Sequence, residues 1–215
     1  MRLVVEDLES RRSGRRIFEG VSFTLSPGEA LVVTGRNGAG KSTLIAILSG
    51  RLRPAAGRVA LEGAGERSLP ESLHLVGHRD GLKAALTAGE NLRFAADLLG
   101  GAGGLSSRDA LARVGLAHAH DLPVAYLSAG QRRRTALARL LVAQRPLWLL
   151  DEPTSALDVA SQETLAELMR AHLAGGGMLV VATHQALGLA DPKRLVVEPA
   201  AARAENAALD AEGGW

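Results

Sequence analysis

The chain has 215 residues, of which 47% are apolar but only 3% aromatic, so we expect one domain with a core of leucine, valine and alanine. No cysteine is present, which excludes disulfides, cysteine-based zinc sites, iron–sulfur clusters and thiol catalysis. The formal net charge is only +2, although the pI is near 9.5, so the composition does not indicate a basic surface for nucleic acid.

Short apolar runs along the chain predict strands. Residues 31–34, 147–150 and 178–182 are continuously apolar, which is typical of strands covered on both faces of a parallel sheet. None approaches the roughly 20 residues that a membrane-spanning helix needs, and the acidic N-terminal sequence MRLVVEDLES does not resemble a signal peptide. The expected strands are Leu3–Glu6, Val21–Leu25, Ala30–Thr34, Arg58–Leu61, Leu73–Val76, Leu147–Leu150, Met178–Ala182 and Arg194–Val197.

Helical patterns fill several of the intervals between these strands. Thr87-x-x-Glu90 and Ser128-x-x-Gln131 fit capping boxes, and Gly100 stands where a helix would end in a left-handed cap. The expected helices are Ser42–Ser49, Thr87–Leu99, Ser128–Ala143 and Val159–Ala174.

The alternation of strands and helices predicts an α/β fold. The stretch 78–143 contains no convincing strand, so we expect a helical sub-lobe inserted into a single domain whose α/β core comprises residues 1–77 and 144–198. Gly100–Ser107 is rich in glycine and serine and is predicted to be a surface loop. Residues 199–215 are expected to form a poorly ordered C-terminal tail.

Gly35–Ser42 reads GRNGAGKS and matches the phosphate-loop pattern GxxxxGK[ST], between a strand and a helix as that motif requires. Its glycines let backbone N–H groups point at a phosphate, and the helix N-terminus adds positive charge. Lys41 would reach the β- and γ-phosphates, and Ser42 would bind Mg²⁺. The alternative is a glycine-rich turn before a surface lysine. The candidate phosphate-binding residues are Gly35, Arg36, Asn37, Gly38, Ala39, Gly40, Lys41, Ser42 and Thr43.

A second candidate cluster follows the apolar run Leu147–Leu150, which ends in Asp151 and Glu152. In open parallel sheets, ligands bind at the carboxyl ends of the strands. Asp151 is therefore placed to hold Mg²⁺, directly or through water, and Glu152 to accept a proton from an attacking water. The alternative is a solvated turn before Pro153.

Three further motifs follow in a fixed order. Leu127–Gln131 reads LSAGQ at the start of a helix, Ser155–Asp158 follows Glu152, and His184 follows the strand Met178–Ala182. With the phosphate loop and the acidic strand, this order resembles the ATP-binding cassette (ABC) ATPases over roughly residues 2–198. Five of the six landmarks of that family are present, namely the phosphate loop, the signature, the acidic strand, the D-loop and the switch histidine.

The resemblance implies a P-loop NTPase with a RecA-like core built on a parallel sheet, an antiparallel β edge subdomain and a helical signature sub-lobe. It also implies ATP and Mg²⁺ as cofactors, and a homodimer in which each ATP lies between the phosphate loop of one domain and the signature helix of the other. Lys41, Glu152 and His184 are then catalytic, while Ser42 and Asp151 bind the metal. The nucleotide contacts implied at the dimer interface are Ser128, Gly130, Gln131 and Asp158.

The missing landmark is the Q-loop glutamine, whose position holds His78. Together with the LSAGQ signature, this histidine resembles the ATP-binding subunits of bacterial cytochrome c biogenesis exporters. The alternative is that His78 simply fills the loop. A histidine there could bind water or metal through one ring nitrogen.

This narrower resemblance implies the motor subunit of a haem exporter, bound peripherally to the cytoplasmic face of the bacterial inner membrane. Its expected partners are integral membrane permease subunits of the CcmB and CcmC kind, with haem reached only through them and with no nucleic acid. The segment His78–Arg93 is expected to dock a coupling helix of the permease. Two alternatives are an exporter of another substrate and, less favoured, a soluble machine acting on DNA or ribosomes, which usually carries a coiled-coil insertion or a second cassette.

Two arginine-rich segments allow more than one interpretation. Arg11–Arg16 lies where many ABC ATPases place an adenine-stacking aromatic residue, so its side chains either stack on the base or form a solvated hairpin turn. Arg132, Arg133 and Arg134, with Arg139, spread around a helix, and we interpret them as a solvated helix face and not as a nucleic-acid site.

Overall fold

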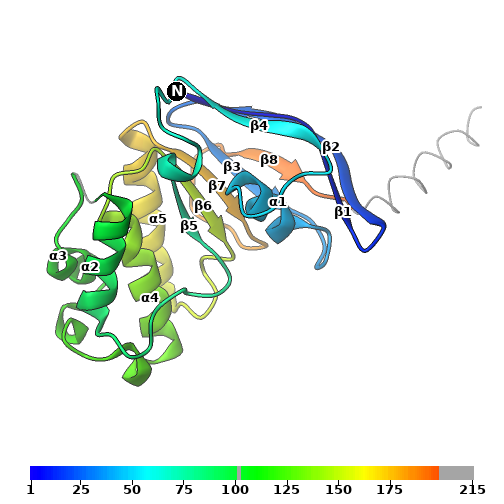
Figure 1. Ribbon diagram of the computed structural model, residues 1–215. Helices are drawn as coiled ribbons and strands as arrows, with labels where there is room; N and C mark the ends of the chain where they lie inside the picture. Colours follow the sequence, from blue (N-terminus) through cyan, green and yellow to red (C-terminus); the bar gives the residue numbers. More distant parts are fainter. Residues whose placement is uncertain (101–102, 199–215) are drawn as a thin grey trace, which may run out of the picture.

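The computed structural model describes residues 1–100 and 103–198, and Figure 1 shows a parallel β-sheet with helices packed on it and a second sheet at one side. The parallel sheet has the strand order β5-β6-β7-β3-β8, and every pair in it is parallel. The predicted α/β fold is confirmed, and each predicted strand of this sheet agrees to within one residue at either end. The strands are β3 (Ala30–Thr34), β5 (Leu73–Val76), β6 (Leu147–Asp151), β7 (Met178–Ala182) and β8 (Lys193–Val196).

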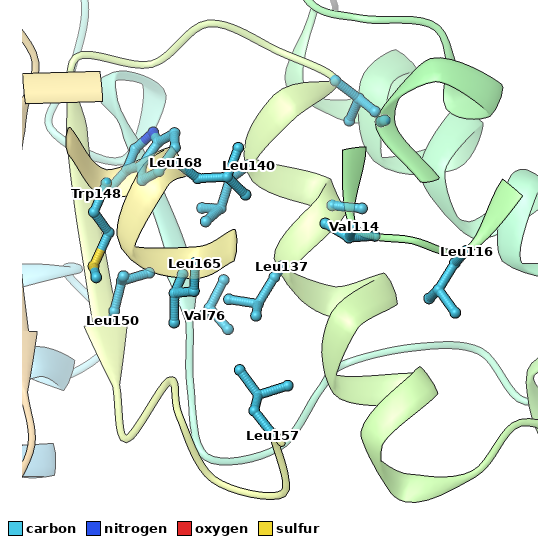
Figure 2. Packing of buried hydrophobic residues seen from close by; sticks show 14 of the residues in the cluster. Val76, Val114, Leu116, Leu137, Leu140, Trp148, Leu150, Leu157, Leu165 and Leu168 are labelled. Atoms are coloured by element: carbon cyan, nitrogen blue, oxygen red, sulfur yellow. The ribbon is translucent and has the colours of Figure 1, made fainter. Parts of the chain in front are cut away.

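Both faces of the parallel sheet are covered, which explains the continuously apolar runs. One set of alternate side chains, including Leu150, packs against helix α5 (Val159–Ala174) and the helical part of the chain, and Figure 2 shows this core. The other set, including Leu149, packs against helix α1 (Lys41–Leu48) and the second sheet. The sheet therefore separates two hydrophobic clusters, and the polar ends of its strands are left at its edges.

The second sheet is antiparallel, with the order β2-β1-β4. Its strands are β1 (Arg2–Arg12), β2 (Arg15–Leu25) and β4 (Ala56–Glu62). Strands β1 and β2 are much longer than predicted. Register shifts after Val5, Leu8 and Ser10 interrupt the alternation of apolar and polar residues, which is the pattern that predicts a strand from sequence. The hairpin turns at Ser13 and Gly14, both at positive φ, and leaves all of Arg11–Arg16 exposed.

The helices between β5 and β6 form a group at one side of the parallel sheet, next to α5 (Figure 1). Helix α2 (Ala88–Leu99) has the predicted capping box of Thr87 and Glu90 and ends at Gly100 in the left-handed conformation. Helix α4 (Ala129–Ala138) has the predicted box of Ser128 and Gln131. It ends earlier than predicted, since the chain tightens into a 3-10 turn. The short 3-10 turns are Pro70–Ser72, Ala117–Ala119, Val124–Tyr126 and Arg139–Leu141.

Helix α3 (Ser107–Arg113) was not predicted as a separate element, although Ser106 caps it by accepting a hydrogen bond from the N–H of Asp109. The predicted loop Gly100–Ser107 lies partly outside the described residues, and the predicted C-terminal tail lies wholly outside them. Among the helices of residues 1–100 and 103–198, none has both the length and the apolar character needed to cross a membrane.

Candidate functional site

The loop between β3 and α1 is shaped by its glycines. Gly35, Gly38 and Gly40 have φ values of 140°, 81° and 109°. A Cβ atom on Gly35 would lie 2.3 Å from the carbonyl oxygen of Val197, and one on Gly40 would lie 2.7 Å from Cγ2 of Ile17. Gly38 has no such neighbour within 4 Å, so its side of the loop is open. Close packing therefore requires glycine at positions 35 and 40, and the positive φ favours glycine at all three positions.

Lys41 begins α1 and folds back over this loop. Its side chain is largely buried, with 8% of the residue exposed, and its Nζ atom donates a hydrogen bond to the carbonyl oxygen of Gly35 at 2.9 Å. The same Nζ atom lies 2.7 Å from Nε2 of His184, and that ring nitrogen lies 3.1 Å from Oδ1 of Asn37. Because an ammonium group can only donate, Nε2 of His184 is the acceptor in its contact with Lys41.

The acidic strand end lies next to these groups. Asp151 is the last residue of β6, and only 5% of it is exposed. Within the described part of the chain, its buried Oδ1 atom has no hydrogen-bond partner. Glu152 has a φ of 46°, its N–H donates to the carbonyl oxygen of Ala182 at 2.8 Å, and its Oε1 atom lies 3.9 Å from Nε2 of His184. A buried carboxylate oxygen without a partner is costly, and a cation would satisfy it.

A pocket of about 650 Å³ connects several of the predicted residues. Ser42, His78 and Asp151 all contribute to its lining. The Ser42 hydroxyl and the Asp151 carboxylate are oxygen donors of the kind that Mg²⁺ prefers, and the unpartnered oxygen of Asp151 leaves a position for it. The donor set therefore fits a magnesium ion. Thr43, the next residue of α1, is half-buried.

The predicted interface residues lie apart from this cluster. Ser128 is exposed and caps α4, and no hydrogen bond between described residues joins Ser128, Gly130 or Gln131 to the phosphate loop. A Cβ atom on Gly130 would lie 3.1 Å from the carbonyl oxygen of Ala156. Asp158 is exposed and caps α5, and hydrogen bonds from the side chain and then the backbone of Ser161 lower its pKa.

Arg133 corrects the interpretation of the arginine-rich helix. The four arginines do not form a solvated face, because Arg132, Arg134 and Arg139 are half-buried and only 3% of Arg133 is exposed. Its guanidinium donates to backbone oxygens of Asp151 and Glu152 at 3.1 and 2.7 Å. The sequence carried one signal for this burial, since Arg133 precedes the buried Leu137 and Leu140 by four and seven residues and thus shares their helix face.

Comparisons with known proteins show what this chain is similar to. The family model described as "ABC transporter" matches residues 18–155. A protein of Bradyrhizobium diazoefficiens named cytochrome c biogenesis ATP-binding export protein CcmA is 56% identical over 83% of this chain and 89% of its own length. The protein of that name from Nitrobacter winogradskyi is 54% identical over 88% and 95%. A solved ATP-binding subunit of an ABC transporter superposes with a TM-score of 0.76 at 26% identity, covering 86% of this chain and 80% of that one.

Proposed function

This chain belongs to the ABC transporter family and is an ABC ATPase, and on that premise we propose that it is the ATP-hydrolysing motor of an exporter for cytochrome c biogenesis. The observation that carries the proposal is that His184 lies next to both Lys41 and Glu152, beside the phosphate loop. The names of relatives more than 50% identical to this chain support the choice of pathway, and the resemblance to haem exporters extends it to haem.

ATP binding falls to the phosphate loop and the first turn of α1. The positive end of α1 and the backbone N–H groups of residues 35–43, apart from that of Ala39, which donates to the carbonyl oxygen of Arg36, provide donors for the phosphates. Lys41 gives up its hydrogen bonds within the protein and donates to the β- and γ-phosphate oxygens.

Ser42 and Asp151 would hold Mg²⁺, because both offer oxygen donors and the buried Oδ1 atom of Asp151 has no partner among the described residues. When bound, the ion supplies positive charge that neutralises the phosphate oxygens. The protein's own part is to hold both oxygen donors on rigid elements, the first turn of α1 and the end of β6. His78 lines the same pocket and stands where a Q-loop glutamine would contact the bound water or metal.

Glu152 is the proposed general base for the attacking water, and His184 would orient that water and the γ-phosphate. A second copy of the chain completes each site, with Ser128, Gly130 and Gln131 approaching the phosphate from the partner and Asp158 crossing the interface. The exposed N-terminus of α4 supports this arrangement, because it offers unpaired backbone donors to an anion.

Integral membrane permease subunits of the CcmB and CcmC kind are the proposed partners, which would hold the chain at the cytoplasmic face of the bacterial inner membrane. Haem would meet these partners and not this chain. The segment His78–Arg93 is proposed to dock their coupling helix. Just beyond it, Phe94 and Leu98 of α2 are exposed apolar residues.

The test is complementation of a bacterium that lacks its own cytochrome c biogenesis ATP-binding protein, read by haem staining of its c-type cytochromes. We expect this chain to restore the stained bands and Glu152→Gln to leave them absent. Purification of the tagged chain from those membranes should recover permease subunits. Export of a different substrate is favoured if the chain hydrolyses ATP and binds permeases but restores no cytochrome.

A further inference from the structure

The guanidinium of Arg133 is saturated with hydrogen bonds. It carries five N–H groups, and five protein oxygens accept from it. Nη2 donates to the carbonyl oxygens of Asp151 and Glu152 at 3.1 and 2.7 Å, and Nε to that of Pro153 at 3.2 Å. Nη1 donates to the carbonyl oxygen of Gly77 at 2.8 Å and to Oδ1 of Asp80 at 3.2 Å.

These acceptors belong to two segments that are far apart in the sequence. The turn Asp151–Pro153 carries the metal-binding and general-base candidates, and the loop Gly77–Asp80 carries His78. Arg133 itself lies on α4, five residues after the cap at Ser128. One side chain therefore joins the end of β6, the loop after β5 and the signature helix.

The contact matters most at Glu152, whose backbone has a φ of 46°. A residue other than glycine is held in that region only when its surroundings determine it. The N–H of Glu152 is fixed by the carbonyl oxygen of Ala182, and its carbonyl oxygen accepts from both Ser155 and Arg133. The buried guanidinium is thus one of the groups that hold this backbone, and with it the direction of the carboxylate.

We propose that Arg133 is a positioning residue for ATP hydrolysis, which sets the general base Glu152 and the His78 loop relative to the signature helix. The inference rests on the proposed function, because it assigns a role in that same reaction. Since Ser128 at the start of this helix is the proposed contact with the partner's nucleotide, Arg133 connects that contact with the base of its own subunit.

The test compares Arg133→Lys with Arg134→Lys. A lysine keeps the charge but has one nitrogen and no planar fork, so it cannot reach both segments. Arg134 is the matched control, since it is half-buried on the same helix and, among the described residues, its side chain donates one hydrogen bond, to the carbonyl oxygen of Val114. We expect Arg133→Lys to lower kcat for ATP hydrolysis by roughly 10- to 100-fold, with KM and the affinity for a fluorescent ATP analogue little changed. Arg134→Lys should match the parent.

A second pair of variants separates positioning from general damage. In the background of Glu152→Gln, which removes the carboxylate, Arg133→Lys should cause almost no further loss of the residual hydrolysis. If Arg133→Lys does not fold, Asp80→Asn replaces it in the test. That variant leaves the guanidinium in place and weakens one contact, so it should lower kcat by less than the fall expected for Arg133→Lys. An unchanged kcat in Arg133→Lys, an equal loss in both backgrounds, or a parallel rise in KM would overturn the inference. A parent protein without ATPase activity would instead contradict the proposed function.

Discussion

The Nζ atom of Lys41 lies 2.7 Å from Nε2 of His184, so the two groups proposed to meet the γ-phosphate contact each other. Residues 143 positions apart in the sequence are brought together because β3 and β7 are parallel neighbours whose carboxyl ends lie at the same edge of the sheet. In the proposed site, the phosphate would replace this contact between the two side chains.

Lys41→Ala should bind ATP weakly or turn it over at least about 10²-fold more slowly than the parent, because it removes the only side-chain charge buried in the phosphate loop. Steady-state ATPase assays and binding of a fluorescent ATP analogue will measure this. Lys193→Ala is the control, since Lys193 is exposed and pairs with Glu29 away from the loop. Normal turnover in Lys41→Ala would disprove the phosphate-loop assignment.

Glu152→Gln should retain ATP binding but lose roughly 10²- to 10³-fold in hydrolysis, because the amide cannot accept the proton of the attacking water. The trapped ATP should then hold two chains together. Size-exclusion chromatography with ATP is expected to show a dimer for this variant and mainly a monomer for the parent. If hydrolysis is unaffected, Glu152 is not the base.

Gly40→Ala should destabilise the fold by roughly 1–3 kcal/mol and weaken ATP binding, because its Cβ would meet Ile17 and Phe18 at 2.7 and 2.9 Å and its φ is 109°. Gly14→Ala is the matched control. Its φ is also positive, at 77°, but nothing lies within 4 Å of the added Cβ. Urea unfolding of the two variants separates steric conflict from backbone strain. Equal stabilities would mean that Gly40 is needed only for its backbone conformation.

The free energy of unfolding should fall as the pH drops from about 6.5 towards 4. Burial lowers the pKa of both His74 and His172 to about 4, so these rings are neutral in the fold at pH values where the unfolded chain protonates them. The unfolded state then binds more protons, and each ring removes up to about 1.4 kcal/mol per pH unit.

Urea titrations of the parent and of His74→Gln at several pH values will measure this slope. His74→Gln should show a shallower dependence, since the carboxylates titrate equally in both proteins. An identical slope would mean that His74 is not kept neutral by its burial.

The sequence could predict those parts of the site that lie within one continuous motif. The phosphate loop and the end of β6 each have a local sequence pattern and follow a strand of a parallel sheet. The carboxyl ends of such strands lie at the same side of the sheet, so the sequence predicts that the two segments are close together. Arg133 could not be found in this way, because its five acceptors come from two other segments and the arginines next to it on the helix are only half-buried. Likewise, the length of β1 depends on register shifts that disrupt the alternating pattern.

One consequence follows from the hydrophobic cluster on the α5 side of the sheet. It contains Leu92 of α2, Leu137 of α4 and Leu150 of β6 in a single continuous body of side chains, and Figure 2 shows the last two in it. Close-packed protein interiors have low compressibility. We therefore expect a displacement of α2 to be transmitted through these side chains to β6, the strand that ends in Asp151.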